Sequence, residues 1–353
     1  MTLLQRTRPS RGSAPDDAAP ARRPVPARVG WLLAAVAALV LVGVASVAFG
    51  VRAVGWSDVV AGVSGATDTV SQAAVNRRVP RTLLAMLVGA ALGLAGAVMQ
   101  GVTRNPLADP GILGVTTGAS LAVVTGIAFL GLSDPTSYVW VAIGGAAVAA
   151  AFVYAVGSLG RGGATPLKLA LAGAATSAAF TSLISAILLP RLDVMDEFRF
   201  WQIGGVGGAT TERTVQVLPF LAVGLLLSLA TARGLNSLAL GDDVAAGLGE
   251  RVALTRLLAA VGAILLCGAA TAVAGPIGFV GLAVPHLCRL VVGPDHRWLL
   301  PASALVGAVL LTAADVVGRL VARPEELDVG IVTALLGAPV FIWIVRRQQV
   351  RSL

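Results

Sequence analysis

The residues best suited to chemistry lie in a short polar segment between two long apolar runs. This segment, residues 234–251, is called the island here and contains the adjacent carboxylates Asp242 and Asp243. Two such carboxylates can hold magnesium around a diphosphate only with a second acidic motif, and the sequence offers none. Ser177 follows Gly-Ala-Ala-Thr and lacks the surroundings of a hydrolase nucleophile elbow. The sequence therefore predicts no enzyme.

Nucleotide and metal binding are not predicted either. A Walker A loop ends in Gly-Lys-Ser/Thr, but Lys168 is the only lysine and stands between two leucines. The glycine-rich stretch 204–208 has no such lysine, so it predicts a flexible outer connection. His286 and His296 have no cysteine or carboxylate at metal-ligand spacing. We expect no directly bound cofactor or metal, and an energy source on another subunit.

The composition predicts an all-α, polytopic membrane protein. Of 353 residues, 56% are hydrophobic and only 12% are charged, whereas soluble domains are roughly 25% charged. Repeated apolar runs near the length of a bilayer crossing predict about ten transmembrane helices. We predict them at residues 30–50, 79–102, 111–131, 137–159, 167–189, 215–233, 253–274, 276–291, 299–321 and 328–346.

Charge distribution predicts the orientation of these spans. Residues 1–29 form a basic tail, expected to be disordered and cytoplasmic, ahead of a membrane domain over residues 30–348. With this tail inside, both termini are cytoplasmic. The positive charge of the tail indicates contact with anionic lipid rather than binding of nucleic acid. The inner loops then hold most remaining basic residues, as the positive-inside bias requires: Arg104, Arg161, Lys168, Arg233, Arg251, Arg289 and Arg297.

Several charged residues do not fit this bias. Five arginines fall on the outer face, where they either snorkel at helix ends or dock an acidic partner: Arg77, Arg78, Arg81, Arg319 and Arg323. Asp315 lies within an apolar span, and Arg319, four residues later, is its expected ion-pair partner. A substrate or proton role and support of partner docking are the alternatives for Asp315.

Two further patterns concern helix contacts. Small residues recur every fourth position along the second span and predict close helix packing, which is compatible with bordering a pathway: Ala85, Gly89, Gly93, Ala97 and Gly101. The island is predicted to form two short helices, the first starting at Asn236 or Ser237 and broken at Gly241. Asp242 is expected to cap the second and Gly249 to end it. The island is either an interfacial loop on the membrane or a surface for a soluble partner.

Several motifs together resemble the FecCD-type permease family of ABC importers, which move iron–siderophores, haem and vitamin B12. The similarity covers about residues 30–348 and is greatest to the ferric enterobactin permease subunits. It rests on the island, Arg-Val-Pro-Arg at 78–81, Gly-Ala-Val-Met-Gln at 96–100, Asn-Pro-Leu-Ala-Asp-Pro-Gly-Ile-Leu-Gly at 105–114, the run 275–286 and Gly-Ala-Pro at 337–339. The enterobactin-type features are Arg-Phe-Trp-Gln at 199–202, Leu-Asn-Ser-Leu at 235–238 and Asp-His-Arg-Trp at 295–298.

The resemblance implies a function and a set of partners. It implies a permease that moves a ferric siderophore, with a catecholate favoured, across the cytoplasmic (inner) membrane. Two ATPases would carry ATP and magnesium below the pore, and a periplasmic or extracellular siderophore-binding protein would dock outside. A second permease subunit, favoured to be a related heterodimer partner, would complete the pore.

The resemblance also implies residue roles. Arg78, Arg81 and Arg319 would meet acidic residues of the binding protein. The coupling contacts to the ATPase would be Leu240, Gly241, Asp242, Asp243, Ala246, Leu248 and Gly249. The helix-packing or pathway residues would be Gly89, Gly93, Gly96 and Gln100.

The chain departs from the family pattern at one outer turn. Asp328 stands where the family often has proline in the segment Glu326-Leu-Asp-Val-Gly, so the turn is less rigid and the local geometry of Glu326 is not carried over. A haem or vitamin B12 importer permease is the nearest alternative function. An ion-coupled secondary transporter is the other, but Asp315 is nearly alone among carboxylates within the spans.

Overall fold

The computed structural model describes residues 24–159 and 165–349, and within these ranges the chain is helical without strands. Ten helices correspond one to one with the ten predicted spans. They are α1 (Val25–Ala48), α3 (Val70–Thr103), α4 (Val115–Leu130), α5 (Pro135–Ser158), α6 (Pro166–Leu188), α8 (Thr211–Ala230), α11 (Val252–Ala274), α12 (Val280–Val292), α13 (His296–Val321) and α14 (Val329–Gln349).

The length and composition of these helices fit a membrane protein. Seven of the described helices are long and apolar enough to cross a bilayer, and α4, α12 and α14 add three shorter apolar segments. Five short elements connect them: α2 (Trp56–Val63), η1 (Pro110–Leu113), α7 (Leu192–Gln202), α9 (Ala232–Leu238) and α10 (Asp242–Gly247). The all-α, polytopic prediction is confirmed.

Two helices begin before the predicted spans do. The first helix begins at Val25, five residues before the predicted start of the membrane domain. α3 extends outward to Val70, because Thr69 caps its N-terminus through the backbone amide of Gln72. Most of the predicted tail, residues 1–23, lies outside the described residues, as does Arg161.

α3 forms the centre of the bundle, and its small residues let neighbouring helices approach closely. Gly89 and Gly93 lie against the backbone of α13 at Gly307 and Ser303, and Gly96 lies against the backbone of Gly281 in α12. A Cβ atom at any of these glycines would meet main-chain atoms rather than a movable side chain. The packing predicted for this ridge is therefore realised within the subunit.

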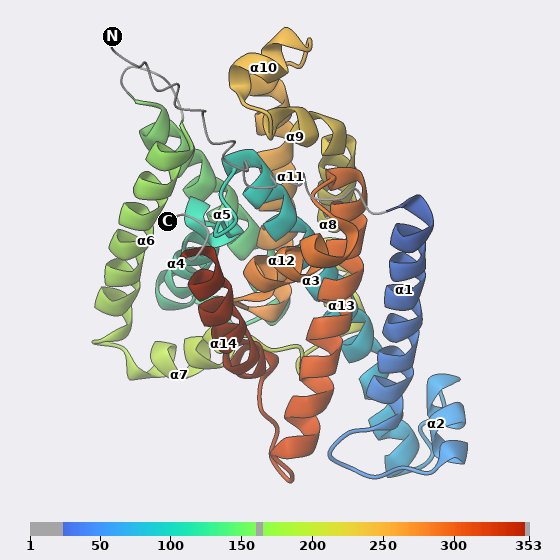
Figure 1. The fold of residues 1–353 in the computed structure, drawn as a ribbon. Helices are drawn as coiled ribbons and strands as arrows, with labels where there is room; N and C mark the ends of the chain where they lie inside the picture. The colour runs from blue at the N-terminus through green and yellow to red at the C-terminus, as the bar shows by residue number, and fades with distance from the viewer. Residues whose placement is uncertain (1–23, 160–164, 350–353) are drawn as a thin grey trace, which may run out of the picture.

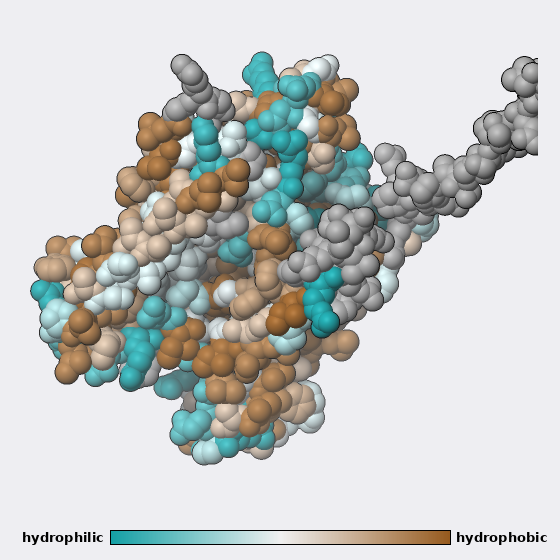
Figure 2. All heavy atoms as spheres, turned by 60° about the vertical axis from the view of Figure 1, so that its left-hand side comes forward, coloured by the Kyte–Doolittle hydropathy of each residue, from teal (hydrophilic) through white to brown (hydrophobic). Residues whose placement is uncertain are grey.

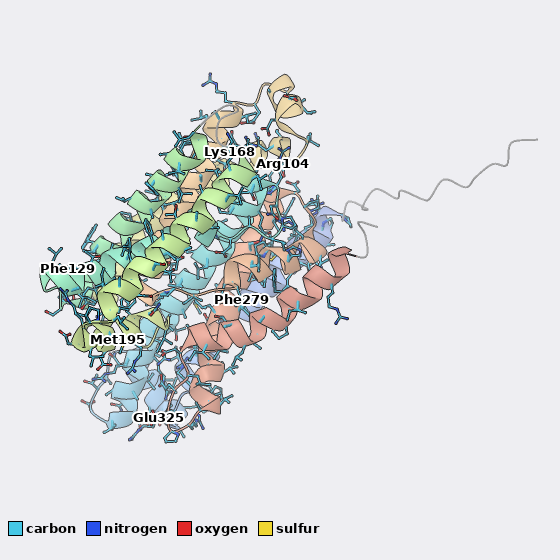
Figure 3. All side chains as sticks on the ribbon, turned by 90° about the vertical axis from the view of Figure 1, so that its left-hand side faces the viewer. Arg104, Phe129, Lys168, Met195, Phe279 and Glu325 are labelled. Carbon is cyan, nitrogen blue, oxygen red and sulfur yellow. The ribbon has the colours of Figure 1, made fainter. Side chains whose placement is uncertain are left out.

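The two ends of the bundle carry different features. In Figure 1, α9 and α10 lie at one end, while α2, α7 and the α13–α14 connection lie at the other. Arg104 lies at the island end and Glu325 at the opposite end in Figure 3. Between the ends, the face in Figure 2 is covered mostly by apolar or weakly polar residues. We call the end with α2 the outer end, following the predicted orientation.

α12 begins inside the bundle rather than at either end. Its N-cap residue Phe279 has a left-handed backbone conformation and lies between Arg104 and Glu325 in height in Figure 3. With 13 residues, α12 is only about 20 Å long, too short for a full crossing. Pro285 within α12 has no N–H for the Gly281 carbonyl, and Gln100 of α3 donates from Nε2 to this carbonyl and to that of Leu282.

Candidate functional site

The island folds as two short helices, as predicted, although the capping details differ. α9 begins at Ala232, before Asn236 and Ser237, because it follows α8 almost directly through Thr231. Gly241 separates the helices with a backbone φ of 104°, a conformation that favours glycine. Gly249 follows α10 with a φ of 84°, which fits its predicted place beyond the C-terminus.

Asp242 anchors α10 to the membrane helices instead of capping it. Its carboxylate lies 2.8 Å from a guanidinium nitrogen of Arg256 in α11 and 3.5 Å from one of Arg104, which follows α3. No side-chain cap hydrogen bond forms at this helix start. Asp243 points to an exposed position. The predicted acidic pair therefore divides into an anchoring residue and a solvent-facing residue.

The outward face of the island is apolar. Leu240, Val244 and Leu248 follow one another at intervals of four residues, and they are 62%, 51% and 66% exposed. Ala246 is exposed beside them, while Ala245 is buried toward the bundle. We call Leu240, Val244 and Leu248 the island's apolar face. Apolar side chains grouped at a polar end of the molecule are typical of a contact surface.

A second anchor, which the sequence reasoning missed, joins α9 to α13. The Asn236 side chain donates to Asp295 Oδ1 at 2.7 Å and accepts from the backbone amide of His296 at 2.9 Å. The Asn236 Oδ1 also lies 2.8 Å from His296 Nδ1. Burial opposes ionisation of Asp295, but hydrogen bonds from Arg297 and Asn236 outweigh it and lower the pKa of Asp295 to about 2.

This anchor reaches two further helices. Arg28 near the start of α1 lies 3.9 Å from Asp295, and the His296 ring lies against Gly101 of α3. The pairing involves residues about 60 positions apart, so no local spacing could have indicated it. The only signal in the sequence was the presence of Asn236 and of Asp295-His296 in two separate motifs. Together, the two anchors connect the island to α1, α3, α11 and α13.

Two of the three predicted docking arginines are occupied within the subunit. Arg78 is 7% exposed and donates to the carbonyls of Val47, Ala48 and Arg52, near the C-terminal end of α1. Arg319 is 2% exposed and donates to the Ser46 carbonyl and hydroxyl and to the Phe49 carbonyl. These guanidiniums satisfy carbonyls that the end of α1 leaves without helical partners.

Arg81 is the predicted docking residue that has access to the surface. Its Nε and Nη2 atoms donate to the Asp315 carboxylate at 2.8–3.2 Å. Its Nη1 donates to Glu326 Oε2 at 2.6 Å, and the Glu326 side chain is 41% exposed. Of the other outer arginines, Arg77 is exposed and Arg323 donates to a backbone carbonyl of Gly50.

Asp315 forms the predicted ion pair and a second one. The expected i,i+4 partner, Arg319, lies 2.9 Å away, and Arg81 from α3 binds the same carboxylate. The Asp315 side chain is 1% exposed, so its charge is balanced within the protein. Arg81 was missed as a partner because it lies 234 residues away in the sequence.

The remaining predicted residues lie inside the subunit at the inner half of α3. Gln100 accepts a hydrogen bond at 2.5 Å from Arg289 of α12 while it donates to the start of the same helix. Gly89, Gly93 and Gly96 are buried in helix contacts. Among the described residues, these four therefore join helices of one subunit.

The described helices define a polytopic membrane protein. The model of the FecCD transport family matches residues 38–347, and the chain belongs to this family. It is 44% identical over 315 residues to the ferric enterobactin transport system permease protein FepD of Escherichia coli, covering 88% of this chain and 93% of the relative.

Two further comparisons agree. The chain is 42% identical over 304 residues to the probable siderophore transport system permease protein YfiZ of Bacillus subtilis, covering 86% of this chain and 91% of the relative. A solved structure, described as an inward-facing conformation of a metal-chelate type ABC transporter, superposes with a TM-score of 0.79 at 30% identity. The superposition covers 90% of this chain and 99% of that chain.

Proposed function

We propose that this chain is the membrane permease of an ATP-driven importer that carries a ferric siderophore across the cytoplasmic membrane. The observation that carries the proposal is the family match over residues 38–347, combined with relatives named for siderophore and enterobactin transport. The enterobactin-type motifs in the island and at residues 295–298 favour a catecholate chelate. Both termini lie on the cytoplasmic side in this proposal.

Uptake by cells that lack their own permease tests the substrate. Cells expressing this chain with its partner subunits are given radiolabelled ferric catecholate, ferric hydroxamate, haem or vitamin B12. We expect the ferric catecholate to accumulate fastest, and only while ATP is available. Uptake that persists without ATP but stops when the proton gradient collapses would instead indicate a secondary transporter.

A separate ATPase dimer, which binds ATP and magnesium, would dock on the island. The island's apolar face offers three exposed side chains to a groove on such a partner, with Asp243 beside them. Burying the face removes apolar surface from water and stabilises the complex at about 25 cal/mol for each Å². A charge placed on this face should prevent its burial.

Substitutions at one leucine test the contact. Leu248→Glu should abolish copurification of the partner ATPase, because docking would bury an unpaired carboxylate. Leu248→Met keeps an apolar side chain of similar volume and should retain the ATPase. Equal recovery of the ATPase with both variants would exclude this face as the contact.

The two anchors give the island a route into the membrane domain. A push on α10 would act on α3 and α11 through Asp242, and a push on α9 would act on α13 through Asn236. α3 and α13 are packed backbone to backbone at Gly89 and Gly307, so they would move as one body. The result would be a change at the outer end, where the same two helices carry Arg81 and Asp315.

A second permease subunit would complete the translocation pathway. α6 exposes a row of small and hydroxyl-bearing residues, which suits a protein contact or a wet pathway better than lipid: Ala174, Ala178, Thr181, Ser182 and Ser185. We favour a related but different subunit because of the resemblance to enterobactin-type permeases. Copurification of a tagged and an untagged copy of this chain would instead support a homodimer.

The outer end would receive an acidic substrate-binding protein. Arg81 is proposed as the residue that meets its carboxylate, because its guanidinium lies near the surface beside exposed Arg77. Arg78 and Arg319 would contribute by holding α1 against α3 and α13. Arg81→Glu should weaken docking in a salt-dependent manner, and unchanged docking would refute the role.

A further inference from the structure

The outer charge network contains one carboxylate that occupies the surface-facing edge of Arg81. Asp315 binds the Nε and Nη2 atoms from within the bundle, which leaves Nη1 as the donor directed elsewhere. Glu326 from the α13–α14 connection takes this donor at 2.6 Å. The Arg81 side chain is 13% exposed and that of Glu326 is 41% exposed, so Glu326 is the accessible member of the pair.

The inner and outer carboxylates differ in what their removal would do. Asp315 is buried and also binds Arg319, so it fixes the position of the Arg81 guanidinium. Glu326 stands in a loop, and among the described residues Arg81 is its only ion-pair partner. Displacing Glu326 would therefore leave Arg81 charged and held in place, with Nη1 open to another carboxylate.

The surroundings leave room for such an exchange. Gly207, an exposed residue of the α7–α8 connection, lies beside Arg81, and a Cβ atom at this position would be 3.7 Å from Nη1. A glycine here leaves this approach free of a side chain. An arriving carboxylate that replaces Glu326 would put the same charge at Nη1 of Arg81, so the ion pairing of this guanidinium would be preserved.

We propose that Glu326 is an internal competitor that holds the docking arginine until a carboxylate of the substrate-binding protein displaces it. This inference rests on the proposed docking role of Arg81. Docking replaces one charge-assisted hydrogen bond of Arg81 by another. The binding protein therefore binds more weakly than it would to an unoccupied Arg81, but it still binds. The released Glu326 also leaves the α13–α14 connection without its tie to α3, which links docking to a change at the start of α14.

Two readouts on the intact transporter in lipid nanodiscs test the competitor. The first is the dissociation constant of the substrate-binding protein that serves this permease. Glu326→Gln removes the competing charge and should tighten binding by roughly two- to fivefold, the range expected for one partly exposed ion pair. Glu325→Gln, at an exposed neighbouring carboxylate without an ion pair in the described structure, is the matched control and should leave binding unchanged.

The second readout needs no partner protein. Phenylglyoxal reacts with accessible guanidinium groups, and mass spectrometry reports its rate of reaction at Arg81. This rate should rise in Glu326→Gln and stay at the wild-type value in Glu325→Gln. Gly207→Leu should lower the rate and weaken docking without changing any charge, because the leucine would cover Nη1.

The outcomes separate the competitor from the docking site itself. If Arg81→Glu weakens docking while Glu326→Gln leaves it unchanged or weaker, the competitor is overturned and the docking role stands. If Arg81→Glu has no effect on docking, the proposed function of this site fails. An unchanged phenylglyoxal rate in Glu326→Gln would also overturn the competitor, since it would mean that Glu326 does not cover Arg81.

Discussion

The replacement of Asp315 by asparagine is the change whose cost can be worked most directly from the structure. The substitution keeps the size of the side chain but removes a charge that is 1% exposed and shared by two guanidiniums. It would leave Arg81 and Arg319 facing each other in the bundle without their common counter-ion. Removing one partner of a buried ion pair costs about 3–5 kcal/mol.

The lower part of this range is expected here. Asparagine still offers one oxygen to Arg81, and Glu326 remains bound to its other edge. We therefore predict that Asp315→Asn lowers the free energy of unfolding by about 3 kcal/mol. The measurement is a titration with sodium dodecyl sulfate in mixed micelles, followed by circular dichroism.

A matched control isolates burial from the change of chemical group. Asp193 is an exposed carboxylate in the first turn of α7. Replacing it by asparagine should lower the free energy of unfolding by no more than about 0.5 kcal/mol. A loss for Asp315→Asn within about 1 kcal/mol of this control would refute the reasoning, because it would mean that the buried guanidiniums do not need the carboxylate.

Three further predictions concern the packing of α3 and the anchors of the island. Gly96→Val should lower the free energy of unfolding by about 2 kcal/mol or more, since its Cβ meets main-chain atoms, whereas Gly144→Val, in open space on α5, should not. Asn236→Leu should raise the pKa of Asp295 from about 2. In the wild type, the lowered pKa stabilises the fold at pH values above the pKa of Asp295 in the unfolded chain, and this stabilisation is lost as the pH falls toward about 2. The free energy of unfolding of the variant should therefore fall less between about pH 6 and about pH 3 than that of the wild type. Arg256→Met should speed amide exchange in α10 by roughly two- to fivefold, and an unchanged rate would contradict the anchor.

Local pattern predicted the elements well because each depends on neighbouring residues. The spans follow from apolar runs, the break in the island from Gly241, and the Asp315–Arg319 pair from spacing on one helix face. Such features are decided within a few turns of chain. They therefore appear in the sequence without knowledge of the tertiary structure.

The partners of the charged residues could be identified only from the tertiary structure. Arg78 and Arg319 match the family's docking residues in the sequence, yet they donate to carbonyls near the end of α1. These carbonyls come within reach only because α1 packs against α3 and α13. The pairing of Arg81 with Asp315 and that of Asn236 with Asp295 join distant parts of the chain. No periodicity links these positions, so their partners were not predictable from the residues alone.

The central claim is that Asp242 connects a separate ATPase to movement of the membrane helices. The most direct test is the amount of ferric chelate imported for each ATP hydrolysed, in proteoliposomes that hold this permease with its ATPase and binding protein. Asp242→Lys would face Arg104 and Arg256 with a third positive charge while leaving the island's apolar face intact. We predict that ATP hydrolysis continues and that import for each ATP falls at least about tenfold, since severing the anchor uncouples the two. An unchanged ratio would contradict the account.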